Sequence, residues 1–570
     1  MTAGAPYRWS EAYDLALRRL MIERGERAYW RGRLADSALA TATAAAALHL
    51  ADGHAHAESV GQAMAWLSET RNDDGGWGDT PASPSNPSCT ALVLAAQRLA
   101  GRPADRAGQA YLASTGGMDA IAGRYGADRT FSVPILTQAA LAGMVDWADV
   151  PALPFELAAL PRWTFRLGPM PVVSYALPAL IAIGLVRHAR RPSASPLVRR
   201  LRAAVTGRVL RRLAAIQPAS GGFLEATPLT GFVAMSLIAS GRGDHPVTER
   251  AIAFLIQAQR ADGAWPIDEN LSIWNTTMAV AALDGGEGAT RDWLIARQRR
   301  TAHPYTGAAP GGWGWSHLPG SVPDVDDTAG ALVALAVLPP SDQAVQAALA
   351  GARWLVGLQN RDGGFPTFCR GWGKLDFDRS APDLTAHALQ ALHRWRSAAG
   401  GALKRAIDRA VRNGLRYLAR TQGPEGSWLA LWFGSQRTAG HTNPVFGTAR
   451  VAGALAAMGE VRHPSALAAK NYLLRTAGAT GGWGADRKAK PTIEETAVAV
   501  DALMRLGLAA GDAPVAGGLN WMTRRILAGG LREPSPIGLY FARLWYHERL
   551  YPISLAVAAL RRALGPPTML

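Results

Sequence analysis

The chain alternates between apolar segments rich in Ala and Leu and short breaks that contain Gly, Pro or Asn. Clear examples of the apolar segments are residues 41–51, 91–100, 331–337 and 498–508. Their length and spacing are typical of helices, whereas runs with the strict alternation of a half-buried strand are scarce. The pattern therefore predicts a fold that is nearly all α.

A short element recurs along the chain: a Gln, three residues, a Gly, one residue and an aromatic side chain. The full copies are Gln217, Gly221 and Phe223; Gln259, Gly263 and Trp265; Gln359, Gly363 and Phe365; and Gln422, Gly426 and Trp428. Degenerate copies keep the glycine and the Trp: Gly75 and Trp77, Gly311 and Trp313, and Gly481 and Trp483. The glycines from Gly221 onward are 42, 48, 52, 63 and 55 residues apart, which fits one helical hairpin per repeat.

Each part of this element has a structural use. The Gln can bridge to backbone at a helix end, the Gly permits a tight turn, and the aromatic ring seals the joint between neighbours. We therefore interpret the copies as structural staples rather than catalytic groups. Stacked hairpins of this kind form either an open solenoid or a closed α/α barrel.

The interval between Gly75 and Gly221 differs from the rest of the chain. It holds an apolar run over residues 171–186, interrupted by Pro178, and nine arginines between Arg187 and Arg212. The run is too short and too kinked to span a bilayer, but fits a buried helix or a segment that dips into one leaflet. A basic segment beside an apolar one indicates contact with anionic lipid, although a solvated Arg-rich helix would look similar. We expect a lipid entrance here.

Composition narrows the choice of partners and compartment. The 570 residues are enough for two large domains, and the formal net charge of +16 is not accompanied by any recognisable nucleic-acid-binding signature. The first residues contain no apolar segment of a secretory signal. The cysteines, Cys89 and Cys369, have no metal-binding spacing and suggest no disulfide framework, which suits a reducing cytoplasm.

Three acidic residues, Asp324, Asp326 and Asp327, stand directly before the apolar run at 331–337. Helix starts favour Asp, because a carboxylate accepts bonds from free N–H groups and meets the positive end of the helix dipole. A chemical interpretation is equally open. Carboxyl groups this close cannot all ionise cheaply, so one proton is held above its usual pKa. Facing an apolar cavity, such a group is a Brønsted acid aimed at a weak base.

A second acidic group and a histidine follow one repeat later. Asp383 and His387 are four residues apart and share one helix face, so Asp383 could hold His387 in its protonated form. His387 could then hydrogen-bond to one of the three earlier acids, although a lone His on such a helix is more often a packed core residue. No phosphate loop, zinc helix or nucleophile elbow is present in the sequence.

Aromatic residues supply the remaining ingredient. Among the 19 Trp and the Phe residues, several stand outside the staples, and their faces could stabilise a cation or simply pack in the core. These are Trp274, Trp315, Phe368, Trp432 and Phe433.

Together these motifs resemble those of the squalene–hopene cyclases, a family of class II triterpene cyclases. Residues 324–329 are similar to the family's protonating motif, the staples to its "QW" repeats, and residues 383–387 to the segment with its histidine. The resemblance implies an all-α fold of two α/α-barrel domains of the α6–α6 type, with the active cavity between them. It places a second, membrane-contacting barrel at residues 19–267 and a catalytic barrel at residues 1–18 plus 268–570. It also implies a monotopic protein on the cytoplasmic face of the membrane, and a possible homodimer.

The resemblance implies roles for particular residues. Asp326 corresponds to the proton donor, with Asp324 and Asp327 tuning its acidity, His387 polarising it and Asp383 orienting His387. Trp315 and Phe368 correspond to cation-stabilising aromatics, Trp274 and Trp428 to aromatics that shape the cavity, and Tyr540 and Phe541 to further lining. The family requires no metal or other cofactor for a substrate without a diphosphate.

This sequence also departs from the family pattern. Asn275 stands where these cyclases usually have Asp, and Thr41 and Thr43 stand where acidic residues serve a terminal water network. Residues 435–444 form an unusual insert. The run of Val325 to Ala329 differs from the motif of oxidosqualene cyclases, which favours a bare alkene over an epoxide as the protonated group.

The resemblance thus implies an isomerase that cyclises a linear isoprenoid, squalene above all, to a polycyclic triterpene of the hopene or hopanol type. One alternative is a class II cyclase of a shorter polyprenyl or meroterpenoid precursor. Another is a non-catalytic α/α-barrel module that binds an isoprenoid or a protein. A Ca²⁺ or Mg²⁺ site at the three acids is a weaker alternative, because their spacing is unlike that of an EF-hand.

Overall fold

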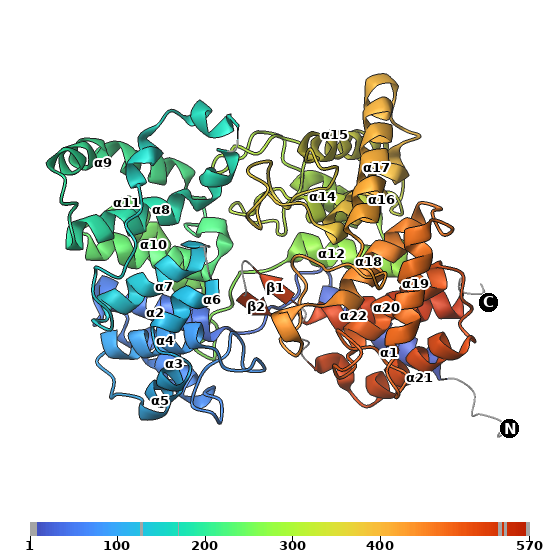
Figure 1. Ribbon diagram of the computed structural model, residues 1–570, viewed down its shortest axis with the longest axis horizontal. Helices are drawn as coiled ribbons and strands as arrows, with labels where there is room; N and C mark the ends of the chain where they lie inside the picture. Colours follow the sequence, from blue (N-terminus) through green and yellow to red (C-terminus); the bar gives the residue numbers. More distant parts are fainter. Residues whose placement is uncertain (1–7, 126–128, 169, 534–537, 541–543, 566–570) are drawn as a thin grey trace.

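The computed structural model describes residues 8–125, 129–168, 170–533, 538–540 and 544–565. In these residues the regular structure is helical, apart from one antiparallel hairpin and four isolated bridges. The hairpin consists of β1 (Gly538–Tyr540) and β2 (Leu544–Tyr546), with Leu539 opposite Trp545. Figure 1 shows two bodies of helices side by side with this hairpin between them. The prediction of an all-α fold is confirmed.

The body that includes the C-terminus, here called the C-terminal barrel, is a closed double ring of helices. Each inner helix contacts the next, and the last contacts the first. The inner helices are α12 (Ser272–Leu283), α14 (Val325–Leu335), α16 (Pro382–Trp395), α18 (Pro444–Ala457), α20 (Ile493–Arg505) and α22 (Leu550–Leu564). The outer helices are α13 (Gly288–Arg297), α15 (Asp342–Leu358), α17 (Gly401–Thr421), α19 (Pro464–Thr476), α21 (Ala513–Leu527) and α1 (Trp9–Arg24). Short 3-10 helices, η4 (Ala439–His441) and η5 (Gly530–Arg532), lie in its loops.

The other body, the N-terminal barrel, is built in the same way around a smaller ring. Its inner helices are α2 (Ala38–Asp52), α4 (Pro87–Leu99), α7 (Arg129–Leu141), α8 (Pro171–Arg190) and α10 (Thr227–Ala239). Around them lie α3 (Ala57–Glu69), α5 (Arg106–Ser114), α6 (Asp119–Tyr125), α9 (Pro196–Ile216) and α11 (Pro246–Ala258), with 3-10 helices η1 (Phe155–Ala159), η2 (Arg162–Arg166) and η3 (Phe223–Glu225). We expected the α6–α6 type for both barrels; among the described helices the inner ring has six members in the C-terminal barrel and five here.

The chain passes between the barrels twice. Helix α1 packs on α21 and α22, and the Trp9 indole N–H donates to Asn520 Oδ1 at 2.8 Å. Residues 25–37 then cross to the N-terminal barrel, and residues 259–271 return. The boundary predicted between residues 18 and 19 therefore falls inside α1, which continues to Arg24, and the one predicted between 267 and 268 falls in the returning segment.

The staples close the joints between hairpins. In one, Gln359 Nε2 donates to the carbonyls of Gly363 and Ala410, both at 2.8 Å. Gly363 has φ +90°, and a Cβ there would lie 2.6 Å from the Asn413 carbonyl oxygen, so only glycine fits. In another, the Trp483 indole donates to the Leu473 carbonyl at 2.8 Å. The prediction that these elements are structural is confirmed.

The staples have a regular hydrogen-bond partner, a Thr hydroxyl, that the sequence motif did not reveal. The backbone N–H of the aromatic residue donates to a Thr hydroxyl on an inner helix, as from Trp313 to Thr328 at 3.0 Å. Thr41 accepts in this way from Trp265 at 3.0 Å, while Thr43 is buried and donates to the Leu39 carbonyl. Thr41 and Thr43 therefore serve the packing of the N-terminal barrel.

Helix α8 explains the apolar run around Pro178. The helix continues through this proline for 20 residues, so by length and composition it could cross a membrane, which we had not expected. However, 61% of its most apolar window is buried in the protein, where it packs against α7 and α10. Membership of the barrel core accounts for its apolar character.

Candidate active site

The three aspartates surround the first turn of α14. Asp324 is the N-cap, and its Oδ1 accepts the backbone N–H of Asp327 at 2.8 Å. Asp324 and Asp327 are both buried, at 4% and 5% exposure, whereas the Asp326 side chain is 18% exposed. The helix-start role therefore belongs to Asp324. Asp326 lies in the first turn of the helix without capping it, so its carboxyl group is available for another contact.

That contact is with His387, on the neighbouring inner helix α16. His387 Nδ1 lies 2.5 Å from Asp326 Oδ1. The structure thus brings together the histidine and the one acid of the three that is not used in capping or fully buried. The predicted pairing of His387 with the acidic group is confirmed by this contact.

The predicted partner of His387 on its own helix does not behave as expected. Both Asp383 carboxylate oxygens lie 3.3 Å from the backbone N–H of Leu431, and no hydrogen bond joins this carboxyl to His387 among the described residues. Spacing of four residues put both side chains on one helix face, but the loop before Phe433 offers Asp383 a nearer donor. Burial raises the pKa of Asp383 to about 7.

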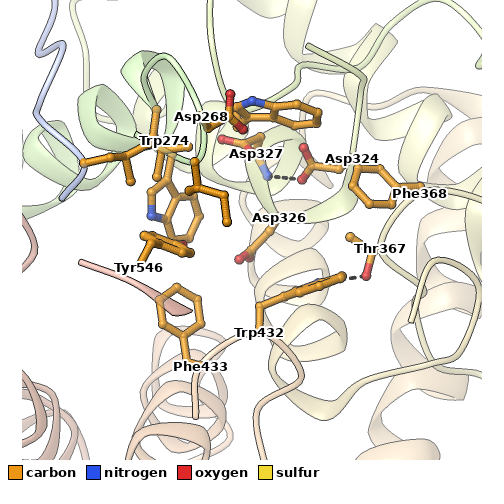
Figure 2. A pocket seen from close by; sticks show the side chains of 14 residues that line it. Asp268, Trp274, Asp324, Asp326, Asp327, Thr367, Phe368, Trp432, Phe433 and Tyr546 are labelled. Carbon is orange, nitrogen blue, oxygen red and sulfur yellow. Dashed lines mark hydrogen bonds between the residues drawn. The ribbon is translucent and has the colours of Figure 1, made fainter. Parts of the chain in front are cut away.

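Asp326 points into an apolar cavity of about 90 Å³. Figure 2 shows its carboxyl group among the rings of Trp274, Tyr546, Phe433 and Trp432. The cavity is lined by Leu34, Ile267, Asp268, Leu271, Trp274, Trp315, Asp324, Asp326, Asp327, Thr367, Phe368, Trp432, Phe433 and Tyr546. Neither Lys nor Arg is among these lining residues. A cation formed here would be surrounded by aromatic faces and carboxyl groups.

The aromatic rings pack against one another and against the histidine. The Trp274 ring centroid lies 6.4 Å from that of His387 and 6.2 Å from that of Phe433. Across the cavity, Trp315 stands edge-on to Phe368, with 6.2 Å between centroids. Mutual packing fixes these rings in place, so their faces are directed before any substrate binds.

Burial disfavours the charged form of the two acids beside Asp326. Burial raises the pKa of Asp324 to about 7, and burial, followed by the charge of Asp324, raises the pKa of Asp327 well above its usual range. Near neutral pH this group of carboxyls therefore carries less negative charge than three separate aspartates would.

A second, larger cavity of about 330 Å³ adjoins the first. Ile267 lines both, and Tyr175, which lines the larger one, has its ring centroid 5.3 Å from that of Phe368. The larger cavity runs between α7, α8 and α10 of the N-terminal barrel and Leu375, Phe377 and Leu544. Its lining is apolar except for Arg129, Thr130 and the hydroxyl of Tyr175.

The remaining predicted residues divide into three groups. Trp274, Trp315 and Phe368 line the cavity with the acids, as expected. Trp428 does not: it is 2% exposed, and its indole donates to the Leu418 carbonyl at 3.0 Å, which makes it a staple. The backbone of Tyr540 pairs with Leu544 in the hairpin, and Phe541 lies outside the described residues.

Sequence reasoning missed several residues of the site. Tyr546 reaches the cavity from β2, and its hydroxyl lies 2.9 Å from that of Tyr551. Asp268 lines the cavity from the segment that returns from the N-terminal barrel. Neither belongs to a repeated motif, so no local signal marks it. The insert at 435–444 packs against β2: the His441 ring stands edge-on to Trp545, with 5.4 Å between the ring centroids.

Asn275, the departure from the expected Asp, also lies behind the cavity wall. Its side-chain amide donates to the Arg31 carbonyl at 3.2 Å, where the chain crosses between the barrels. The neighbouring Glu548 carboxylate accepts the backbone N–H of Arg33 at 2.9 Å. Asn275 thus joins the crossing segment to α12, and we find it with a structural contact rather than among the lining residues.

The raised pKa of Asp383 predicts a pH effect on stability. A carboxyl group whose pKa rises on folding favours the folded state below its unfolded pKa, near 4, and loses this contribution as the pH rises toward 7. We expect Asp383→Asn, which cannot ionise, to be more stable than the parent at pH 8 by on the order of 3 kcal/mol, and no more stable at pH 4. Urea unfolding at both pH values measures this. An equal difference in the free energy of unfolding between variant and parent at both pH values would contradict the prediction. The control is Asp342→Asn, which changes an exposed acid.

Two family models match the chain: the squalene-hopene cyclase N-terminal domain over residues 14–203 and the squalene-hopene cyclase C-terminal domain over residues 270–563. A probable squalene–hopene cyclase from Sinorhizobium fredii is 26% identical and covers 86% of this chain and 87% of its own length. A drimenyl diphosphate synthase from Streptomyces showdoensis is 29% identical over 55% of this chain and 54% of its own.

Other similarities concern longer proteins and the fold. Enfumafungin synthase from Hormonema carpetanum is 25% identical over 84% of this chain, which spans only 42% of that relative's length. The chain likewise spans 42% of the length of a terpene cyclase–glycosyl transferase fusion protein from Humicola fuscoatra. Among solved structures, ent-copalyl diphosphate synthase from Streptomyces platensis superposes with a TM-score of 0.55 at 21% identity, over 98% of this chain and 100% of that one. This last likeness concerns the fold.

Proposed function

Because this chain belongs to the squalene–hopene cyclase family of class II triterpene cyclases, we propose that it cyclises a linear isoprenoid by protonating its terminal double bond. The observation that carries the proposal is the Asp326 carboxyl group, 2.5 Å from His387 and facing an aromatic cavity. An alkene is a feeble base. It needs an acid that is kept away from water and whose conjugate base is stabilised.

The first step uses Asp326 as the proton donor. The π electrons of the terminal double bond form a C–H bond with the carboxyl proton, the O–H electrons stay on Asp326, and the neighbouring carbon becomes a tertiary cation. The carboxylate left behind accepts a hydrogen bond from His387 Nδ1–H. Burial raises the pKa of Asp324 and Asp327, so these two groups repel the new negative charge less than two fully ionised carboxylates would.

The cation then moves along the chain as each further double bond attacks it and closes a ring. The faces of Trp274, Trp315 and Phe368 stabilise positive charge without donating an electron pair to form a bond. Trp432 and Phe433 extend this aromatic wall. The last cation loses a proton or captures water, so the overall reaction is an isomerisation or a hydration, with Asp326 reprotonated for the next cycle.

Squalene is the substrate we propose. The larger cavity shares the lining residue Ile267 with the smaller one and offers an almost wholly apolar wall for a long hydrocarbon. A diphosphate head group would require several cationic side chains, and Arg129 is the one Lys or Arg among the described lining residues of the two cavities. The relative named drimenyl diphosphate synthase keeps a shorter, head-modified isoprenoid open as the second candidate, with Arg129 as its contact.

Product analysis separates these candidates. Membranes that contain the protein are fed squalene or geranylgeranyl diphosphate, and the extracts are compared by gas chromatography and mass spectrometry with those of Asp326→Asn. Polycyclic C30 products from the parent protein alone support squalene cyclisation. Cyclised C20 products without C30 products favour the head-modified substrate. No product from either, in a folded protein, favours the binding module.

We also propose that the N-terminal barrel rests on a membrane surface. Large apolar side chains are exposed on η1 and η2, directly after each of them, and at the start of α9; this apolar patch consists of Leu157, Leu160, Trp163, Leu167, Leu197 and Leu201. Trp163 is 61% exposed and Leu197 is 75% exposed. Exposed arginines of α9, such as Arg199 and Arg208, stand on the same helix. Exposed apolar groups with nearby cations suit an anionic lipid surface.

The apolar patch and the larger cavity both border α8. Helices η1 and η2 contact α8, whose residues Ala176, Ala179 and Ile183 line that cavity. We therefore propose this side of the N-terminal barrel as the entrance for a hydrocarbon that leaves the bilayer. The cytoplasmic location and the dimer remain predictions from the sequence.

Vesicle binding tests the membrane proposal. We expect Trp163→Ser combined with Leu167→Ser to weaken binding to phosphatidylglycerol vesicles by about tenfold or more, because two large side chains no longer enter the lipid. Sedimentation with vesicles at low and high salt measures this. The control is Trp372→Ser, which alters a Trp of similar exposure, 49%, on the other barrel. Equal binding of the double variant and the control would argue against the patch.

A further inference from the structure

Two successive residues of η3 hold a backbone conformation that side chains other than glycine rarely adopt. Leu224 has φ +58° and Glu225 has φ +57°. Among the described residues, Asp284 and His441 are the other non-glycine residues with positive φ, and neither has a non-glycine neighbour in this conformation. Such a conformation is strained for a residue with a Cβ and persists only where the surroundings hold it.

The Glu225 side chain supplies the contacts that hold it. The residue is 1% exposed, and its Oε1 accepts the Ser220 hydroxyl at 2.9 Å and the backbone N–H of Gly320 at 2.5 Å. Gly320 belongs to the C-terminal barrel, so this carboxyl group ties one barrel to the other. A Cβ at Gly320 would lie 2.6 Å from Glu225 Oε1, so the two segments approach as closely as backbone allows.

The two ends of this tie lead to the two cavities. On one side, Leu224 and Ala226 form part of the wall of the larger cavity. On the other, Gly320 lies in the loop over residues 316–323, whose flanking residues, Trp315 and Asp324, line the cavity with the catalytic acid. A shift of Gly320 relative to Glu225 would therefore change how the two cavities meet.

The same segment makes a second connection between the cavities. Ala226 forms an antiparallel bridge with Asp268, which lines the smaller cavity, and the backbone N–H of Thr227 donates to Ile267, which lines both, at 3.2 Å. Glu225 is thus flanked by residues of the cavity wall on both sides. Its own carboxyl group points away from the substrate space, toward Ser220 and Gly320.

We propose that Glu225 is a positioning residue for cyclisation: by tying η3 to Gly320 it fixes Leu224 in the cavity wall and so determines how many rings close before the cation is quenched. The inference rests on the proposed function, because a ring count has meaning only for a cyclase. Glu225 acts through Leu224 and does not touch the substrate. Its removal should therefore alter the product ratio more than the protonation step.

Three variants test this. Glu225→Ala removes both hydrogen bonds to Oε1, Glu225→Gln keeps an acceptor of the same size, and Leu224→Gly keeps the tie and the left-handed backbone but removes the side chain from the wall. We expect Glu225→Ala and Leu224→Gly to raise the proportion of products with fewer rings at least about fivefold, and Glu225→Gln to stay within about twofold of the parent. Turnover of squalene into all products should fall much less than the ratio changes.

Amide hydrogen exchange gives a readout that needs no substrate. Loss of the tie should speed exchange in residues 316–323 and 221–227 in Glu225→Ala but not in Leu224→Gly. If Glu225→Ala does not fold, Glu225→Gly, which relieves the positive φ while removing the same carboxyl, replaces it. An unchanged product ratio in Glu225→Ala or Glu225→Gly, or in Leu224→Gly, overturns the inference. Absence of any cyclised product from the parent protein would instead count against the proposed function, while the exchange data would still report on the tie.

Discussion

Replacement of Asp326 by Asn will abolish cyclisation and leave the barrel folded. The amide is of nearly the same size, but it cannot give a proton to an alkene, so we expect turnover to fall by about 10⁴-fold or more. Asp326 caps no helix and its side chain is partly exposed to the cavity, so the free energy of unfolding should change little. Product formation from squalene and thermal unfolding measure the two quantities.

Two comparisons make this result specific. Asp342→Asn changes an exposed acid in the first turn of α15, as Asp326 lies in the first turn of α14, and should leave turnover unchanged. A folded Asp326→Asn variant with more than a few per cent of parental activity would remove Asp326 from the role of donor. Asp324 and Asp327 would then become the candidates, since both line the same cavity.

Substitution of His387 by Phe should have the second-largest effect. The ring fills the same space but offers no donor to Asp326 Oδ1, which now lies 2.5 Å from His387 Nδ1. A hydrogen bond to a charged group contributes about 1.5–3 kcal/mol, so kcat should fall roughly 10- to 100-fold as the carboxylate formed by proton transfer loses this stabilisation. The measurement is the initial rate with saturating substrate.

The control and the double variant separate this role from packing. His393→Phe alters an exposed histidine of the same helix, α16, and should keep the parental rate. Because His387 acts only through Asp326, the double variant Asp326→Asn, His387→Phe should lose no more activity than Asp326→Asn alone. Additive losses would indicate that His387 has a separate contact with the substrate.

Local sequence signals identified the staples and the acid because each depends on residues close together in the chain. Gly363 must be glycine for reasons of backbone conformation, and Asp324 must stand where α14 begins, so both leave a readable pattern. The contact between Asp326 and His387 could be expected as well, because consecutive repeats place their inner helices side by side.

Other parts of the site depend on contacts that no local spacing encodes. Asp383 shares a helix face with His387, yet its partner is the Leu431 backbone in a distant loop. Trp428 has the motif of a staple, and burial in that joint keeps it out of the cavity. Tyr546 reaches the cavity only because the hairpin lies between the barrels. The positions of these side chains depend on contacts with residues distant in the sequence, which form only in the folded chain.

The place of α1 has a consequence for synthesis on the ribosome. Its apolar face, formed by Trp9, Ala12, Ala16 and Leu20, packs against α21 and α22, more than 480 residues further along the chain. The N-terminal barrel, from α2 to α11, is complete long before those partners emerge. The nascent polypeptide must therefore carry α1 without its final neighbours until α21 and α22 have been synthesised, which makes this face a natural ligand for chaperones.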